Sequence, residues 1–581
     1  MQSSGFATGN WSRLTPDNTG SYVNGTWSLL ATMPSVYAPL FYASAVLPDG
    51  RVVVEGGEHN GNQRGAETSL GAIYNPVTNS WTSISPPSGI TEIGDAQSVV
   101  LSNGTFMVGL CCFQTAQYLL NASTLTWTAT GSGKADSNTE EGWTLLPNGK
   151  VLAVDTQNGT NSELYNPSTG SWSSAGSTIV ALSDGSPNLE IGPAVLRPGG
   201  TVFATGGTSD TAIYNPTTGG WSAGPTFPSG LDVADGPAAL LPSGNVLIDS
   251  SPGVFQNGTH FFEFNGTSLI SVPAPANAAS RTSFQGRMLV LPTGQILFTD
   301  QSSTVQIYTP GGAFQNAWRP TITAVATALK PSSTNNAISG TQFNGLSQGG
   351  MYGDDAQMAT NYPLVRITNN ASGHVFYAKT HGHSTMAVAT GTATVSTQFD
   401  VPGNTESGAS TLQVVANGIP SNSVAVTITG SSQATGALGI TGNVTCTSTD
   451  TGPNCDFGTF QVTINNTTET VSYNGLGFYG LSADPGTPQA IAQAIVDAFN
   501  NDPNSPVTAT LGGNGVWLAQ FTTKQGGSGV NFGTNLVVTS IYDQENNSNP
   551  LAQGLTWSWT PSNAASFTWA SPISGSLSGG H

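Results

Sequence analysis

Carboxylates recur at one kind of place in the first half of the chain, just before a short apolar run. Asp95, Glu140, Glu141, Glu190 and Asp235 all stand at such positions. Clustered carboxylates shift one another's pKa and offer oxygen ligands to hard cations. The group could therefore bind calcium, bind the hydroxyls of a sugar, or act as the acid and base of a glycoside hydrolase. Alternatively, the side chains are solvated or bind neighbouring backbone.

The equivalent positions at the two ends of this region carry other residue types. Phe41 and Tyr42 stand there near the N-terminus, and Arg281 and the pair Phe284-Gln285 stand there near residue 285. Aromatic rings beside carboxylates are typical of sugar sites, because the rings form an apolar platform with polar groups at its edge. We expect Tyr42 and Arg281 to join the carboxylates in one ligand site.

Two smaller groups lie further along the chain. His381 and His383 are two residues apart, so they would share one face of a strand and could form a metal edge. A loop packed against the preceding domain is the alternative. Asp354 and Asp355 could bind calcium, although a turn explains them equally well. We expect the neighbouring Cys111 and Cys112 to be buried thiols, since adjacent residues of a strand point to opposite faces.

The elements that position these residues belong to a repeat, with clear copies at Phe41–Trp81, Glu141–Trp172 and Gly192–Trp221. Each copy reads as four strands joined by tight turns, because Asp-Gly or Asn-Gly supplies positive φ and Asn-Pro makes the later turn. The first turn recurs at intervals of 44 to 54 residues, which is close to the period of a β-propeller blade. The turn anchors are Pro48, Ser102, Pro147, Pro198, Pro242 and Pro292.

Six copies predict a six-bladed β-propeller over residues 1–318. We expect the strand near Trp27 to complete the sixth blade and close the ring, which removes an open sheet edge. If Trp318 ends a complete sixth blade instead, Trp27 belongs to a degenerate seventh.

The repeat stops near Arg319. Short alternating strands over residues 319–430 predict an immunoglobulin-like β-sandwich. A propeller followed directly by this sandwich, with the segments at Gly340–Gly345, Tyr352–Asp355 and Thr380–His383, resembles the galactose oxidase/glyoxal oxidase superfamily. The resemblance covers about residues 20–430 and is closest to secreted bacterial kelch-type members.

The resemblance implies a copper–radical centre, which needs a cysteine cross-linked to a tyrosine, a Tyr-His pair and a second histidine from the sandwich. His381 matches the last of these. The Tyr-His slot reads Phe284-Gln285, and no cysteine precedes Tyr42. Copper(II) prefers several imidazole-type ligands, so the sequence favours the fold and argues against the oxidase.

A Ser/Gly-rich linker precedes a small α+β module over residues 437–550, and a Ser/Gly-rich tail covers 551–581. Cys446 and Cys455 flank a turn and predict a hairpin disulfide. Thr487 and Pro488 predict the start of a helix whose apolar stripe is Ile491, Ile495 and Phe499. This module could mediate self-association.

Composition limits the partners. The net charge of −19 disfavours nucleic acid and anionic membranes, and no apolar run is long enough to span a membrane. Few lysines and a predicted disulfide favour a secreted or cell-surface protein whose signal peptide has been removed. We therefore expect an extracellular protein that binds a glycan or another polymer, with calcium as a possible cofactor and copper disfavoured. An enzyme of the same fold, either an altered copper oxidase or a carbohydrate hydrolase, is the alternative.

Overall fold

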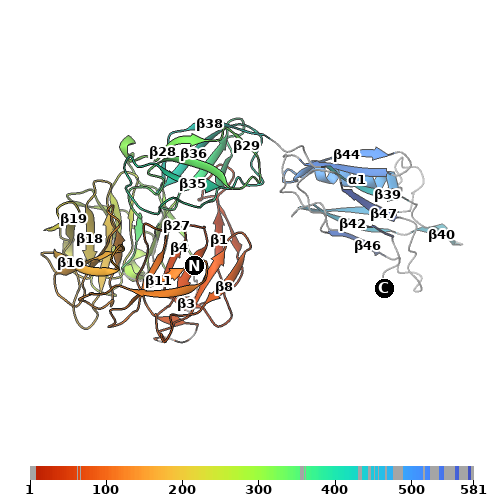
Figure 1. Cartoon of the computed structure of the whole chain (residues 1–581). Helices are drawn as coiled ribbons and strands as arrows, with labels where there is room; N and C mark the ends of the chain where they lie inside the picture. Colours follow the sequence, from red (N-terminus) through yellow and green to blue (C-terminus); the bar gives the residue numbers. More distant parts are fainter. Residues whose placement is uncertain are drawn as a thin grey trace.

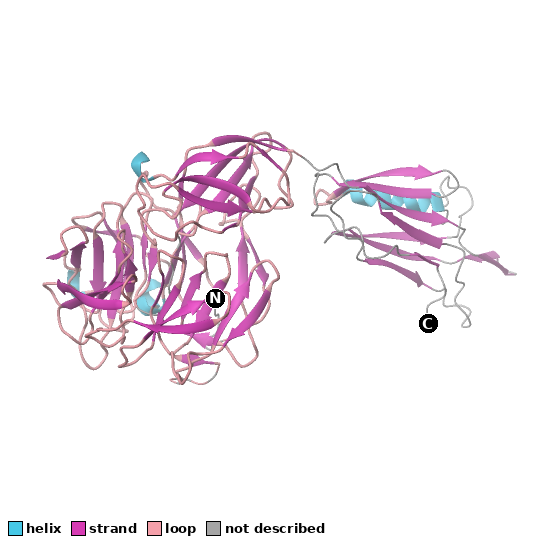
Figure 2. Cartoon of the chain, viewed as in Figure 1, coloured by secondary structure: helices cyan, strands magenta, loops and turns pink. Residues whose placement is uncertain are grey.

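The computed structural model describes residues 8–61, 63, 65, 67–353, 359 and 361–429, followed by 435–441, 446–449, 452–455, 457–464, 467–474, 488–513, 517–523, 535–541, 556–561 and 574–576. This part of the chain is all-β apart from short 3₁₀ turns and one α-helix, α1 (Pro488–Asn501), which Figure 2 shows among the strands of the C-terminal region. No helix in it is long and apolar enough to cross a membrane.

Six antiparallel sheets follow one another between residues 43 and 308. Sheet one contains β4 (Ala43–Val46), β5 (Val52–Glu55), β7 (Gly71–Asn75) and β8 (Ser80–Ile84). Sheet two contains β9 (Ser98–Val100), β10 (Phe106–Gly109), β11 (Gln117–Asn121) and β12 (Thr126–Thr130). Sheet three contains β13 (Trp143–Leu145), β14 (Val151–Val154), β15 (Asn161–Asn166) and β16 (Ser171–Ser177).

Sheets four to six continue the series. Sheet four contains β17 (Ile191–Leu196), β18 (Val202–Gly206), β19 (Ala212–Asn215) and β20 (Gly220–Ala223). Sheet five contains β21 (Ala238–Leu240), β22 (Val246–Ser250), β23 (His260–Phe264) and β24 (Leu269–Val272). Sheet six contains β25 (Arg287–Val290), β26 (Ile296–Thr299) and β27 (Gln306–Tyr308).

The turn residues of the repeat act as the sequence predicts. In the first hairpin of sheet one, the N–H of Gly50 donates to the carbonyl of Leu47 at 2.8 Å, and Gly50 has a φ of 82°. Only glycine adopts this left-handed conformation without strain. A glycine with positive φ occupies the same turn in the other five sheets, at Gly104, Gly149, Gly200, Gly244 and Gly294.

The Tyr-Asn-Pro and Trp positions form the outer hairpin. Tyr74 pairs with Trp81 across β7 and β8, with ring centroids 5.1 Å apart, and the N–H of Val77 donates to Asn75 Oδ1. The carboxamide therefore forms the turn, and the aromatic pair fixes the register. The same cross-strand pairs are Tyr165–Trp172 and Tyr214–Trp221.

The six sheets pack on one another in chain order. The first strand of each sheet contacts the first strand of the next, in the order β4, β9, β13, β17, β21 and β25. Phe41, just before β4, lies 6.3 Å from Phe284, just before β25. The first strands thus follow one another from sheet one to sheet six, and the residues preceding the first and the last of them lie close together.

The N-terminal strand differs from expectation. β2 (Thr26–Leu29), which contains Trp27, pairs with β1 (Ser12–Thr15) and does not complete sheet six, which has three strands among the described residues. The segment after β2 instead runs along sheet one, where the indole N–H of Trp81 donates to the carbonyl of Ala31 at 2.9 Å. Side-chain bonds to sheet one decide this placement, which the strand pattern alone could not predict.

Residues 321–428 form two facing sheets. One contains β28 (Thr321–Val325), β30 (Asn336–Thr341), β35 (Val395–Phe399) and β34 (Thr380–His381). The other contains β29 (Ala328–Leu329), β38 (Val424–Ile428), β36 (Gly408–Ala416), β32 (Leu364–Asn369) and β33 (Val375–Ala378). Apolar side chains of both sheets, including Phe343 and Phe399, form a shared core. These strands lie beside the six sheets in Figure 1.

One strand of this later region leaves it. β31 (Gly350–Met351) pairs with β21 as a fifth strand of sheet five, with Met351 opposite Ala238. The N–H of Leu240 donates to the carbonyl of Gly349 at 2.8 Å, and the N–H of Leu145 donates to Gln348 Oε1 at 2.9 Å. Residues 348–353, which we call the inserted segment, therefore lie among the first strands of the six sheets.

The C-terminal module combines α1 with two main sheets. The strand order of the first sheet is β44 (Val507–Gly513), β45 (Trp517–Thr523), β39 (Thr435–Thr441), β47 (Thr556–Pro561) and β48 (Ser574–Ser576). The strand order of the second is β43 (Thr467–Asn474), β42 (Phe457–Ile464) and β46 (Asn535–Ile541).

The predicted stripe of α1 is confirmed, because Ile491, Ile495 and Phe499 are buried. The proposed cap Thr487 lies outside the described residues. The hairpin of β40 (Cys446–Thr449) and β41 (Gly452–Cys455) pairs Cys446 with Cys455 in register. Their disulfide stays a prediction.

Candidate functional site

The residues that precede the first strands have an unusual backbone. Phe41, Glu140 and Asp235 have φ values of 52°, 56° and 49°. Residues other than glycine avoid this left-handed region, and strain of this kind gathers at ligand sites. Here the left-handed residue turns the chain from the connecting loop into the first strand. We call the region where these residues lie the mouth.

Three carboxylates converge on one side of the mouth. Glu140, Glu190 and Asp235 come from sheets three, four and five, and each offers an oxygen atom within 4.8 Å of the others. Glu190 is buried and the other two are half-buried. Local bonds hold the backbone, since the N–H of Glu190 donates to Asp184 Oδ1 at 2.8 Å and that of Asp235 to the carbonyl of Ile191 at 2.9 Å. The sequence predicted all three.

Aromatic rings form the other side of the mouth. Phe284 lies 6.3 Å from Phe41 and 5.4 Å from Phe255, and Phe41 lies 5.9 Å from the ring of His59. Phe255 is 45% exposed, which is high for a large apolar side chain. An exposed ring supported by other rings can stack on a flat, partly apolar ligand.

The inserted segment forms the floor between these two sides. The hydroxyl of Tyr352 donates to the carbonyl of Phe284 at 2.8 Å, and the guanidinium of Arg287 lies 3.7 Å from the centre of the Tyr352 ring. Arg287 also donates to the carbonyls of Phe284 and Gly286 at 2.7 Å. Gly353 follows, and a Cβ atom there would lie 2.7 Å from Asp235 Oδ1. The segment thus contacts both the aromatic and the acidic side.

Four other predicted site residues do not join this cluster. Tyr42 packs with Trp11 in an apolar cluster beside sheet one. Glu141 is fully buried behind the mouth and pairs with Lys134. Asp95 is absent from the cluster, and its N–H donates to Glu67 Oε2. Arg281 lies 3.7 Å from Asp300 Oδ2. Adjacent residues point in different directions at these turns, so sequence position alone could not separate Phe41 from Tyr42 or Glu140 from Glu141.

The histidine pair does not form a metal edge in the described residues. His381 Nε2 lies 3.0 Å from Asp400 Oδ1, whereas His383 packs edge-on against the ring of Tyr362 at 4.9 Å. Burial, together with the nearby His381, lowers the pKa of His383 to about 4. Asp354 and Asp355 lie outside the described residues.

The side chains that the oxidase resemblance assigns to copper do not suit that ion. Phe41 and Phe284 contribute hydrocarbon rings, and the Gln285 side chain accepts the N–H of Thr282. His381 is engaged with Asp400. The potential metal groups found in the described residues contain carboxylates and cysteines but no histidine, whereas copper(II) prefers imidazole.

Cys111 and Cys112 form a disulfide with each other, which corrects the prediction of free thiols. Cys112 and Phe113 have φ values of 59° and 66°, so the chain leaves its extended form there and the side-chain alternation of a strand does not apply. Glu67 lies close to this disulfide. Disulfide sulfurs are poor ligands compared with thiolates, so this group is not a good metal site.

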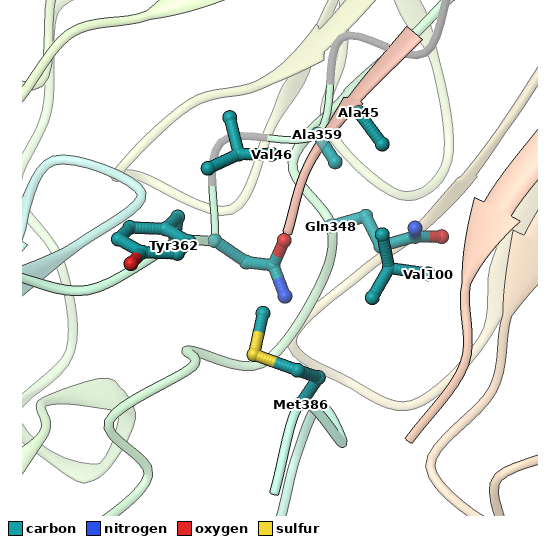
Figure 3. Close-up of a pocket in the computed structure, with 8 residues that line it drawn as sticks. Ala45, Val46, Val100, Gln348, Ala359, Tyr362 and Met386 are labelled. Carbon is teal, nitrogen blue, oxygen red and sulfur yellow. The ribbon is translucent and has the colours of Figure 1, made fainter. Parts of the chain in front are cut away.

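A small enclosed pocket lies elsewhere, between sheets one and two and the later chain. Figure 3 shows Val46, Val100, Gln348, Tyr362 and Met386 around it. Its volume of about 20 Å³ suits a water molecule and excludes a larger ligand.

Sequence reasoning missed Tyr352, Arg287 and Phe255. Arg287 stands two residues after Gln285, separated from it by Gly286, and could have been suspected from its closeness to Phe284-Gln285. Tyr352 could not, because it reaches the mouth only through the pairing of β31 with β21.

Comparison with known proteins gives little further information. No family model matches the chain, and no curated protein matches it. A structural search finds a solved structure titled "Novel fungal alcohol oxidase with catalytic diversity among the AA5 family, in complex with copper", at 15% identity and a TM-score of 0.39, covering 73% of this chain and 95% of that chain. The AA5 enzymes are a galactose oxidase-like family, and at this similarity the fungal oxidase is a distant structural neighbour of the present chain. Its copper and its activity are properties of that protein.

Proposed function

We propose that this chain is an extracellular glycan- or polymer-binding protein, and that its six sheets are the blades of a six-bladed, kelch-type propeller with the ligand at the mouth. One observation carries the proposal. Glu140, Glu190 and Asp235 lie close together on one side of the inserted segment, and Phe41, Phe255 and Phe284 lie on the other.

This arrangement suits a sugar better than a fully apolar or a strongly anionic ligand. Pyranose rings present C–H groups that pack on an aromatic face, and their hydroxyls donate to carboxylates in charge-assisted hydrogen bonds. An anionic polymer would be repelled by the carboxylates and by the net charge of −19.

A panel of immobilised neutral and charged glycans, probed with the purified protein, tests the proposal first. We expect binding to neutral or cationic glycans. Calorimetry on the best ligand should then give an affinity roughly 10-fold weaker for Phe255→Ala and roughly 10- to 100-fold weaker for Asp235→Asn.

Two substitutions away from the mouth are matched controls. Ile270→Ala removes an apolar side chain that is 48% exposed on β24, and Asp49→Asn alters an exposed carboxylate that pairs with Arg51. Both should leave the affinity unchanged. Absence of glycan binding, or equal loss in the controls, would contradict a mouth site.

A hydrolase is a second candidate, because of the spacing of the cluster. Retaining glycosidases place two carboxyl groups about 5–5.5 Å apart, and the oxygens of Glu190 and Asp235 lie within 4.8 Å. Release of reducing ends from a bound glycan, abolished in Glu190→Gln, would favour this candidate over simple binding.

We assign the C-terminal module the part of a spacer or self-association module in an exported protein. Sedimentation of the full chain and of a chain ending after residue 429 tests this. A larger assembly in the full chain alone is the expected result, and identical monomeric behaviour would contradict it.

A further inference from the structure

A second group of carboxylates lies inside sheet three, directly behind the mouth. Asp136 and Glu141 come from the loop before β13, and Asp155 follows β14. Their side chains are almost completely buried, with residue exposures of 3%, 0% and 1%. Each offers an oxygen within 4.8 Å of the other two.

The charge of this group is not balanced. Lys134 Nζ is buried and donates to Glu141 Oε1 at 2.8 Å and to Glu163 Oε2 at 2.6 Å. Glu163 is buried as well. The positive charge of Lys134 is therefore set against four buried carboxyl groups, those of the three clustered residues and of Glu163. Buried charge is costly unless it is paired with an opposite charge or binds a metal ion.

Within the part of the chain that the structure describes, two oxygens of the group have no hydrogen-bond partner, namely Glu141 Oε2 and Asp155 Oδ1. Asp136 Oδ2, for comparison, accepts the backbone N–H groups of Thr156 at 2.8 Å and Gln157 at 3.0 Å. Buried carboxylate oxygens are rarely left without a partner, and such an atom needs an explanation such as an ion.

We infer that Asp136, Glu141 and Asp155 bind a calcium ion. All the donors are oxygens, which hard cations prefer, and the group contains no nitrogen or sulfur ligand that would favour zinc or copper. Calcium–oxygen distances of about 2.3–2.6 Å put ligands on opposite sides of the ion about 5 Å apart. The oxygens lie within 4.8 Å of one another, which is compatible with that geometry. Magnesium usually keeps several bound waters, whereas these three side chains are almost completely buried, which favours calcium.

A bound proton is the competing way to neutralise the group. Burial raises the pKa of Glu141 to about 8 and that of Asp155 to about 7, against the opposing effect of Lys134. Protonation would remove charge, but it would not account for three carboxylates whose oxygens converge on one place. A bound ion would also position the mouth. Glu141 is adjacent to Glu140 in the chain, so an ion that holds Glu141 would also hold the loop that places Glu140 at the mouth.

This inference does not rest on the proposed function, and its test needs no glycan. The full chain is dialysed against calcium at pH 7.5, then against metal-free buffer, and its metals are measured by mass spectrometry. We expect about one calcium ion per chain, lost in Asp155→Asn and in Glu141→Gln. Asp235→Asn, at the mouth, should retain it.

A second measurement uses the wild-type protein, so that a poorly folded variant does not decide the result. Trp172 lies beside Lys134, with the ammonium 4.8 Å from its ring centre. Terbium, a luminescent substitute for calcium, should show tryptophan-sensitised emission that calcium displaces and magnesium does not. Calcium should also raise the unfolding temperature in proportion to the logarithm of its concentration.

The contrary results are distinct. No bound calcium and no terbium emission would mean that protons neutralise the group, and the inference would be wrong. Calcium that is lost in Asp235→Asn but kept in Asp155→Asn would place the ion at the mouth and overturn the buried site. Preferential binding of magnesium would overturn the choice of ion.

Discussion

At the scale of single residues, several carboxyl groups of this chain are buried, although charged residues make up only 8% of it. Glu55 is fully buried in β5, and neither of its carboxyl oxygens has a hydrogen-bond partner among the described residues. The Glu55 side chain fits because its partner across β5 and β7 is Gly71. A Cβ atom on Gly71 would occupy the space that the Glu55 carboxyl group fills. Burial raises its pKa well above the ordinary value of 4.5.

The raised pKa predicts how stability depends on pH. The folded protein keeps a proton on Glu55 that the unfolded chain releases above about pH 4.5, so the unfolding free energy falls as pH rises from there toward the folded pKa. Glu55→Gln should flatten this dependence by up to about 1.4 kcal/mol per pH unit. Urea unfolding between pH 5 and 8 measures it.

Asp49→Asn, at the exposed turn that follows β4, is the control and should leave the pH dependence as it is in the wild type. An unchanged slope in Glu55→Gln would mean that Glu55 is ionised in the folded protein.

At the scale of elements, the inserted segment decides the shape of the mouth. It passes so close to the loop before β13 that a Cβ atom on Gly142 would lie 2.2 Å from the carbonyl oxygen of Gly353. Backbone atoms cannot move aside cheaply, so this position requires glycine.

Gly142→Ala should therefore displace the segment, lower the unfolding free energy by roughly 1–3 kcal/mol, and weaken ligand binding because Tyr352 moves with Gly353. Chemical unfolding and calorimetry measure the two effects. Gly199→Ala is a matched control, since nothing lies within 4 Å of the added methyl group there and its φ is not in the left-handed region. Equal behaviour of the two variants would show that the contact with Gly353 is unimportant.

At the scale of the whole molecule, the six sheets and the later region share many bonds. Ser102, in a turn of sheet two, accepts the N–H of Met386 at 2.9 Å and the hydroxyl of Thr385 at 3.0 Å. Leu145 and Leu240 bond to the inserted segment, and Val388 lies in the core of sheets two to four.

We therefore expect a chain ending after residue 429 to unfold in one calorimetric transition. A chain ending after residue 318 should be markedly less stable, because it loses β31 and leaves the buried N–H groups of Leu145 and Leu240 without acceptors. Two separate transitions in the longer chain, or equal stability of the shorter one, would contradict this coupling.

The sequence by itself determined the repeated four-stranded pattern, since its information is local. Gly50 and its equivalents specify turns through their own φ, and Tyr74 and Trp81 specify a register between neighbouring strands. It also predicted a larger group of carboxylates, because they occupy the same place in successive repeats. Glu140, Glu190 and Asp235 of that group lie together, whereas Asp95 and Glu141 do not.

Only the tertiary structure decided which side of each turn faces the mouth. A left-handed residue sends Phe41 and Glu140 one way and their neighbours Tyr42 and Glu141 another, and the pattern of residue types does not reveal this. It also brought Tyr352 to the site and β2 away from sheet six. Those placements depend on hydrogen bonds and packing between segments far apart in the chain, which no local pattern encodes.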